Sequence, residues 1–208
     1  MQGSQVSVRA ERKPDQTRRR ILEAAYQEMY RRGFQGMRLD EVIAASGLTK
    51  GALYHHFPNK RALGYAVVEE VIKPMLEATW LEPLRQADDP LQSLLQVIES
   101  MPTQKPGDLM VRYGCPLNNL AQEMSPLDEG FRQRLNDAFD LWHGAIGDAL
   151  REAQARGTIA ADIDCSDVAS FVMAALEGCI GLAKNAQSVA RLAACNRGLV
   201  QYLGSLRR

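Results

Sequence analysis

The sequence lacks the motifs and segments that mark most enzymes and membrane proteins. It contains no P-loop, no dinucleotide-binding glycine fingerprint, no G-x-S-x-G elbow and no H-E-x-x-H pair, so nothing supports nucleotide-dependent, hydrolytic or zinc-protease chemistry. No apolar stretch approaches the roughly 18–20 residues that a membrane-spanning helix needs. Residues 1–14 also lack the apolar core of a signal peptide. We therefore expect a cytoplasmic protein that is not an enzyme and carries no cofactor.

Cysteine is scarce. The four cysteines lie far apart, with no C-x-x-C pair and no histidine at zinc-ligand spacing: Cys115, Cys165, Cys179 and Cys195. In a reducing compartment such cysteines are more often small buried apolar side chains than metal ligands or disulfides. We expect no metal site.

Net charge is also absent, because 25 Lys and Arg balance 25 Asp and Glu. The two signs are nevertheless unevenly distributed: residues 1–60 carry 11 basic against 6 acidic residues, and the remainder carries 14 against 19. A disordered basic tail accounts for Arg9 to Lys13, but not for the basic residues in the periodic segments that follow. This asymmetry is typical of a protein that meets a polyanion at one end only.

Helical periodicity begins after Pro14, and no alternating strand pattern bounded by turns is present. The first helix is expected to end at Gly33, and Pro74 to kink or end the fourth. The remaining expected helices are roughly 39–46, 49–56, 74–86, 90–101, 108–124, 127–156, 165–184 and 188–206. The pattern predicts an all-α fold with a flexible basic arm (1–14), a three-helix helix-turn-helix domain (15–60) and a larger helical domain (61–208).

The helix-turn-helix signature lies in Gly47–Phe57, which reads GLTKGALYHHF. Gly47 supplies the positive φ that the turn needs. The positions required by a small three-helix core are apolar: Val42, Leu48, Leu53 and Phe57. The exposed positions belong to a short helix whose N-terminal end can enter the major groove of DNA: Thr49, Lys50, Ala52, Tyr54 and His55.

This run, followed by Lys60 and Leu63, resembles the DNA-binding motif of the TetR family of repressors, and the resemblance covers roughly residues 15–65. It implies a homodimer that binds a palindromic DNA operator and is released by a small-molecule effector. It also implies that Lys60 anchors the DNA backbone and that Gly51 permits close approach. The groove and phosphate contacts implied are Thr49, Lys50, Ala52, Tyr54 and His55.

Three positions depart from the family pattern. Met37 and Arg38 stand where threonines are common, which removes the expected cap of the second helix, although Arg38 can still reach phosphate. Ile43 replaces a smaller alanine. Tyr54 and Phe57 can alternatively be core aromatics, an interpretation that suits Phe57 better. A metal pair at His55 and His56 is disfavoured, since adjacent helical residues point about 100° apart.

The last two expected helices are unusually apolar. Their apolar stripes comprise Val168, Phe171, Val172, Ala175, Leu176, Cys179, Ile180 and Ala183 on one, and Leu192, Leu199, Val200, Leu203 and Leu206 on the other. These stripes can form an intramolecular core. The family resemblance implies instead a four-helix dimer interface.

The segment Gly114–Met124 places amides and a carboxylate beside Cys115 in an otherwise apolar helix, and buried polar atoms need partners. It is similar to a stretch in a TetR subgroup, some of whose members respond to electrophiles or small unsaturated compounds. With the aromatic and methionine residues nearby, it suggests a pocket with Asn119 and Glu123 as polar anchors. The candidates are Met75, Trp80, Met110, Tyr113, Cys115, Asn119, Glu123, Phe139, Trp142 and His143.

Alternatives remain at these positions. Each pocket candidate can be an ordinary core residue, and the polar groups can cap neighbouring helices. Cys115 is either a sensor thiol or an unreactive buried one. For the whole protein, an enzyme with an ancillary DNA-binding part and a purely structural oligomer are the competitors of a ligand-gated regulator. The first lacks a catalytic motif, and the second leaves the basic N-terminal region unexplained.

Overall fold

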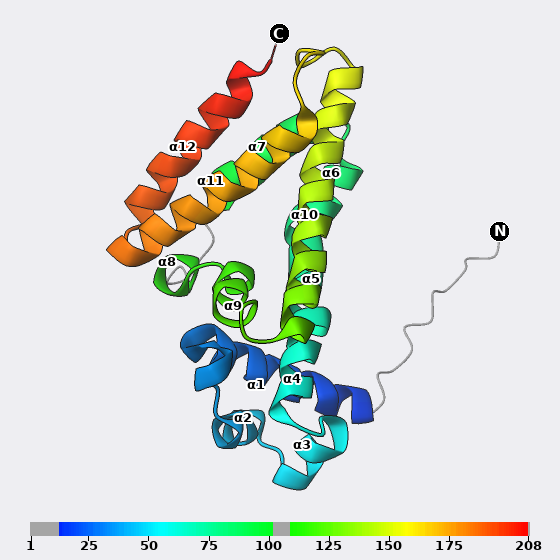
Figure 1. Ribbon diagram of the computed structural model, residues 1–208, viewed down its shortest axis with the longest axis vertical. Helices are drawn as coiled ribbons and strands as arrows, with labels where there is room; N and C mark the ends of the chain where they lie inside the picture. Colours follow the sequence, from blue (N-terminus) through cyan, green and yellow to red (C-terminus); the bar gives the residue numbers. More distant parts are fainter. Residues whose placement is uncertain (1–12, 102–108, 208) are drawn as a thin grey trace, which may run out of the picture. The chain divides into compact units, whose positions relative to one another are not determined.

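The computed structural model describes residues 13–101 and 109–207, which are helical almost throughout (Figure 1). The predicted all-α class is confirmed. The chain forms two compact units, one ending at Val67 and one beginning at Val68. The sequence had suggested a boundary after residue 60. The predicted flexible arm falls on residues 1–14, of which 1–12 lie outside the described residues.

The first unit consists of α1 (Lys13–Gly36), α2 (Leu39–Ser46), α3 (Lys50–His56) and α4 (Lys60–Val67). As predicted, Gly33 interrupts α1, since its φ of 75° is not helical. Helix α1 packs against the other three helices. The side chains at the centre of this packing are 0–1% exposed: Ile21, Ala25, Val42, Leu53 and Leu63. Three short helices are thus held by one long one.

Helical backbone continues from α4 through Pro74 and Pro83 to Gln86. It passes through η1 (Val68–Ile72), α5 (Lys73–Leu76), η2 (Glu77–Leu81) and α6 (Glu82–Gln86). The helix therefore does not end at Pro74 as one expectation had it, and a wider π-helical turn precedes each of the two prolines. A proline lacks the N–H that an α-helical turn requires, and a π turn changes the hydrogen-bond register around the gap.

The second unit is completed by α7 (Pro90–Ser100), α8 (Leu109–Tyr113), α9 (Pro116–Met124), α10 (Glu129–Ala155), α11 (Cys165–Ala186) and α12 (Val189–Ser205). The single helix expected over 108–124 is wrong, because the chain breaks between α8 and α9. Gly114 adopts a φ of 88°, and Pro116 starts the next helix. The break places Cys115 at the N-terminus of α9, preceding its first turn.

Helix α11 lies between α10 and α12 in the fold of this unit (Figure 1). Most of its apolar stripe is buried there, including Val172 and Leu176 at 0% exposure and Ile180 at 3%, as are Leu192, Leu199 and Leu203 of α12. The stripes are therefore the intramolecular core, and assigning them to a dimer interface was wrong. Phe171 is the exception, at 53% exposure.

By length and composition alone, α11 could cross a membrane, with a mean hydropathy of 1.5. The expectation that no segment reaches this length is therefore wrong. The composition has a simpler cause, because α11 packs against α8, α10 and α12 and also carries apolar residues on its exposed side. Three charged residues interrupt it: Asp167, Glu177 and Lys184. One such helix, which packs in a core, is weak support for a membrane span.

Cys179 and Cys195 form a disulfide between α11 and α12, with their Cα atoms 5.6 Å apart. This corrects the expectation that all four cysteines are unpaired. The two residues are 16 positions apart in sequence, and the antiparallel pairing of the two helices brings them together. Cys115 and Cys165 remain free thiols.

Reduction of this disulfide should lower the free energy of unfolding by about 3 kcal/mol, the chain-entropy value for a loop of this length. We expect dithiothreitol to lower the melting temperature of the wild type and to leave that of Cys195→Ser unchanged. Cys165→Ala, which lacks a buried free thiol, should still respond to the reductant. A wild-type melting curve indifferent to dithiothreitol would contradict the assignment.

Candidate nucleic-acid interface and ligand cavity

The turn between α2 and α3 is built around Gly47, whose φ of 62° and ψ of 31° are left-handed. Its N–H donates to the carbonyl of Ala44 at 3.2 Å, which closes α2. From α1, Arg20 donates to the carbonyl of Ser46 at 2.6 Å. The Ser46 hydroxyl donates to the carbonyl of Ile43 at 3.0 Å. These contacts fix the angle at which the chain enters α3.

Helix α3 begins at a confirmed cap, because the Thr49 hydroxyl accepts from the backbone N–H of Ala52 at 3.2 Å. Lys50 and His55 are exposed, and Tyr54 is 42% exposed with the Lys50 amine 6.0 Å from its ring centroid. Phe57 is only 2% exposed and lies under the Arg18 guanidinium, as its core assignment predicted.

α3 therefore exposes a polar face and buries the opposite one. Of the residues predicted to contact DNA, Thr49, Lys50, Gly51, Tyr54 and His55 are exposed together on or at the start of this helix, and Ala52 is half-buried.

The other two predicted DNA contacts lie near this helix in sequence but differ in environment. Arg38 occupies the cap position of α2, is exposed and makes no side-chain capping bond, in keeping with the lost threonine. Lys60 donates to the carbonyl of Gln35 at 2.9 Å, with its amine 5.2 Å from the centroid of Phe34. The Lys60 amine thus joins the start of α4 to the end of α1, and an ammonium has three donors in all.

The second unit contains a mostly apolar cavity of about 90 Å³. Among its walls are the predicted residues Met75, Trp80, Met110, Cys115 and Trp142. The two indole rings are in contact, with centroids 4.9 Å apart. Elements distant in the sequence meet here, since other walls come from η1, α5, η2, α9, α11 and the residue after α7: Ile72, Leu76, Thr79, Met101, Pro116, Leu117, Glu177 and Ile180.

The remaining predicted effector residues do not line this cavity. The Asn119 amide donates to the carbonyl of Tyr113 at 2.5 Å and accepts from Lys184 at 3.0 Å, so it joins α9 to α8 and α11. His143 bonds to the carbonyl of Ser166 and the hydroxyl of Ser170, both at 3.1 Å. Three others lie outside the lining and are half-buried: Tyr113, Glu123 and Phe139.

Glu177 is the cavity residue that the sequence analysis missed. Both carboxylate oxygens are buried, and neither has a hydrogen-bond partner. Burial raises the pKa of this carboxyl, and the nearby Cys115 and Asn118 side chains oppose that rise without reaching hydrogen-bond geometry. The Trp142 indole nitrogen is also buried without a partner. The sequence feature that could have pointed to Glu177 is its position as a single acidic residue within the apolar run of α11.

Cys115 keeps some exposed surface as a residue, but its sulfur is enclosed. Burial, followed by the negative charge of Glu177, raises the pKa of the thiol well above its usual value. The thiolate is the nucleophilic form of cysteine. Cys115 therefore has the electrostatics of an unreactive wall residue, which was one of the two alternatives.

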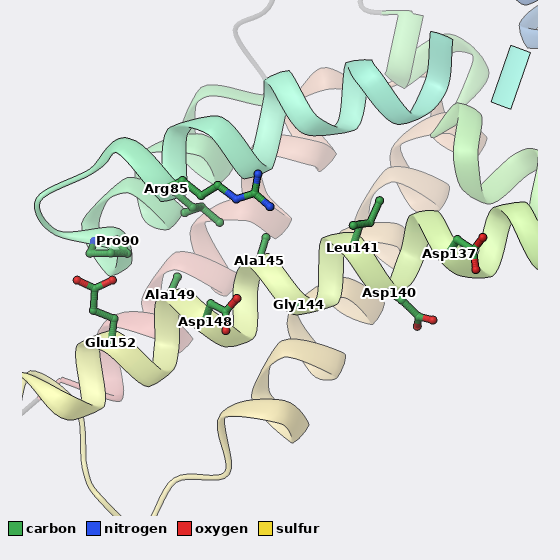
Figure 2. Close-up of a pocket in the computed structure, with 11 residues that line it drawn as sticks. Arg85, Pro90, Asp137, Asp140, Leu141, Gly144, Ala145, Asp148, Ala149 and Glu152 are labelled. Atoms are coloured by element: carbon green, nitrogen blue, oxygen red, sulfur yellow. The ribbon is translucent and has the colours of Figure 1, made fainter. Parts of the chain in front are cut away.

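A larger open groove of about 720 Å³ runs along α10 beneath Arg85 of α6 (Figure 2). Its carboxylates are engaged by neighbours: Asp148 pairs with Arg151 at 2.6 Å, and Glu152 pairs with Arg156. Asp140 accepts from Asn136 at 2.8 Å, and Asp137 lies 3.9 Å from Lys73. We assign no ligand to this groove, because each of its carboxylates already has a neighbouring partner.

The left-handed turn gives a test of the first unit. Gly47→Ala should destabilise it by about 1–2 kcal/mol, because an L-residue is disfavoured at this φ. In addition, the new Cβ would lie 3.2 Å from the Arg20 guanidinium. Gly51→Ala is the matched control, since its Cβ meets only the Thr49 hydroxyl, at 3.9 Å. Hydrogen exchange of the α2 and α3 amides measures both, and equal protection in the two variants would contradict the turn's role.

Comparisons with known proteins agree with this geometry. Residues 21–67 match the family description "Bacterial regulatory proteins, tetR family", and residues 89–199 match "Tetracyclin repressor-like, C-terminal domain". The chain is 30% identical to the transcriptional regulator AcuR of Cereibacter sphaeroides over 79% of this chain and 74% of that protein. It is 26% identical to the transcriptional repressor DhaR of a Mycobacterium species, over 78% and 80% of the two chains.

A solved structure gives the same result. The crystal structure of a TetR transcriptional regulator from Chloroflexus aurantiacus superposes with a TM-score of 0.82 at 25% identity, covering 95% of this chain and 99% of the other. Both family descriptions and these relatives cover the helix-turn-helix and most of the second unit. The chain therefore belongs to the TetR family of DNA-binding transcriptional regulators.

Proposed function

We propose that this protein is a cytoplasmic repressor that binds a palindromic operator as a homodimer and leaves it when a small molecule occupies the cavity of the second unit. The observation that carries the DNA-binding part is the exposed polar face of α3, set at a fixed angle by Gly47 and capped by Thr49. A rigid short helix with a free N-terminal end suits the major groove. Its relatives are regulators, which also favours a non-enzymatic role.

Within this proposal the α3 residues divide by chemistry. Lys50 supplies a phosphate contact at the helix N-terminus, and Tyr54 and His55 reach the groove from the following turn. Gly51 has no side chain and Ala52 a small one, which lets the DNA approach α3 closely. Arg38 and the remaining donors of Lys60 flank this helix as further phosphate contacts.

The proposed effector site is the cavity lined by Trp80, Met110, Cys115 and Trp142. Its support is a mostly apolar lining with few polar groups, the usual character of a small-molecule site. Ile72, at the end of η1, is also part of the wall, and helical backbone continues from η1 back into α4. A ligand that favours one arrangement of η1 would thereby shift the population of DNA-binding states.

The proposed dimer face is the exposed side of α11. Phe171, Ala174, Gly178, Gly181 and Leu182 share one side of the helix, and all are exposed. Apart from the neighbouring residues and backbone of α11 itself, no atoms of the described chain lie within 4 Å of a Cβ built on either glycine, so another backbone can approach closely. Two large apolar side chains flank this small-residue surface, at 53% and 55% exposure. An exposed apolar surface of this kind suits a second copy of the chain.

DNA fragments selected by the purified protein supply the operator for the central test. Lys50→Ala should weaken operator binding by about tenfold. It should also make the slope of log affinity against log salt shallower by about 0.9, the value for one lost phosphate contact. Tyr54→Ala should weaken binding and relax sequence preference.

Arg85→Ala is the matched control, because it also removes one positive charge but lies in the second unit. It should leave affinity and salt slope unchanged. Wild-type binding by both α3 variants, or an equal loss in Arg85→Ala, would defeat the assignment of α3.

Phe171→Glu combined with Leu182→Glu should give a monomer with much weaker operator affinity, because a monomer holds only one half-site. Leu176 and Ile180 are unsuitable for this test, since both are buried within one chain and a charge there would unfold it. Leu127→Glu, at a residue 62% exposed before α10, is the control. Sedimentation of the double variant as a full dimer would contradict the proposed face.

A further inference from the structure

Glu177 is the one ionisable side chain besides Cys115 in the described cavity wall. Its two carboxylate oxygens are covered by protein atoms and accept no hydrogen bond. No cation lies within ion-pair distance of it in the described part of the chain. A buried carboxylate without a partner is costly, and that cost falls when a cation or strong donor arrives.

The nearest basic side chain on the same helix is already engaged elsewhere. Lys184 lies two turns after Glu177 on α11, and its amine donates to the Asn119 amide oxygen at 3.0 Å. The closest polar neighbours of the carboxylate are the Cys115 thiol and the Asn118 amide, neither of which carries positive charge. The protein therefore supplies a negative group to the cavity without supplying its counter-ion.

The remaining walls suit a positive charge better than a negative one. Trp80 and Trp142 present aromatic surface, and Met75, Met101 and Met110 present polarisable thioethers. Aromatic faces attract cations through their quadrupole, and Arg or Lys is the usual partner in proteins. Here that attraction adds to the charge of Glu177, whose carboxylate oxygens are buried.

The cavity is small. An engineered cavity of about 150 Å³ holds one benzene molecule. On that scale the 90 Å³ here admits about four non-hydrogen atoms, or somewhat more if the flexible methionine walls move.

We infer that the effector is a small organic ammonium ion whose positive end pairs with Glu177 and whose hydrocarbon part lies against Trp80 and Trp142. The inference rests on the proposed effector function of this cavity and names its ligand class. Cys115 acts as a neutral wall residue in this site, and no covalent step is involved.

The probe is n-propylammonium, with 1-propanol as a neutral solute of the same size and propionate, one atom larger, as an anionic one. The chain contains 2 tryptophans, and both line the cavity, so intrinsic fluorescence reports on its occupancy directly. We expect saturable, millimolar binding of n-propylammonium, in keeping with so few atoms. 1-Propanol and propionate should bind at least about tenfold more weakly.

Glu177→Gln, which keeps the shape and removes the charge, should weaken n-propylammonium binding at least about tenfold. Glu177→Met provides a second variant without a buried polar group and should do the same. Glu99→Gln, at an exposed position of α7, should bind as the wild type does. Thermal melting identifies any variant that has lost its fold.

The affinity should also fall as the pH is lowered through the raised pKa of Glu177, because the ammonium binds the ionised carboxyl. Other charged or titratable side chains on α11 and the neighbouring helices include Cys115, whose pKa is also raised, Lys184, Arg112 and His143. The His143 ring is bonded to Ser166 and Ser170. The pH dependence should disappear in Glu177→Gln, whereas a contribution of any other group would persist.

Equal or tighter binding of 1-propanol or propionate would overturn the inference. So would unchanged n-propylammonium binding in both Glu177 variants, or the lack of saturable binding up to tens of millimolar. Operator binding is measured separately without ligand. A protein that binds its operator but ignores n-propylammonium refutes this inference alone, whereas binding at Glu177 without any specific DNA binding refutes the proposed repressor.

Discussion

The packing of α11 between α10 and α12 is the constraint on which the second unit depends. Successive residues of a helix point about 100° apart, so three consecutive positions face three directions. Leu176 is buried in the core, Glu177 lines the cavity, and Gly178 lies on the exposed side. One helix therefore contributes to stability, to the proposed ligand site and to the proposed dimer face. A shift or rotation of α11 cannot alter one of these without altering the others.

The helical run from Lys60 to Gln86 also contributes to more than one part of the protein. Its first segment packs in the helix-turn-helix unit, while Ile72 and Trp80 line the cavity further along. The π-helical turns η1 and η2 lie within the part that meets the cavity. Such turns often occur at functional sites, where the altered hydrogen-bond register allows small changes of helix geometry. In the proposed function, this continuous helical backbone is the connection from the ligand to α4.

The helix-turn-helix was predictable because its signals are local. Gly47, Thr49 and Phe57 each specify a turn, a cap or a core position within a few residues. The cavity was predictable only in part. An acidic residue such as Glu177 is ordinarily expected to face solvent, and only the packing of α11 shows that it lines the cavity. The Cys179–Cys195 bond likewise depends on how α11 and α12 align against each other, which the spacing of the cysteines did not indicate. The dimer stripe was misassigned because a helix packed on both sides buries the very residues that a periodic pattern selects.

A ligand of about four atoms sets a stringent condition on any switch at this cavity. Moving a two-state equilibrium from 1:99 to 99:1 takes about 5.5 kcal/mol of differential binding. Millimolar binding of a four-atom ligand supplies only about 4 kcal/mol, so the shift must be smaller than this even at its largest. Nearly all of the binding free energy must then discriminate between states. A buried carboxylate without a counter-ion meets this condition, because its pairing with a cation is either made or absent. An apolar cavity of the same size would bind its ligand in both states with smaller differences. Under the proposed function, the charge of Glu177 is what would let so small a ligand distinguish the two states of the protein.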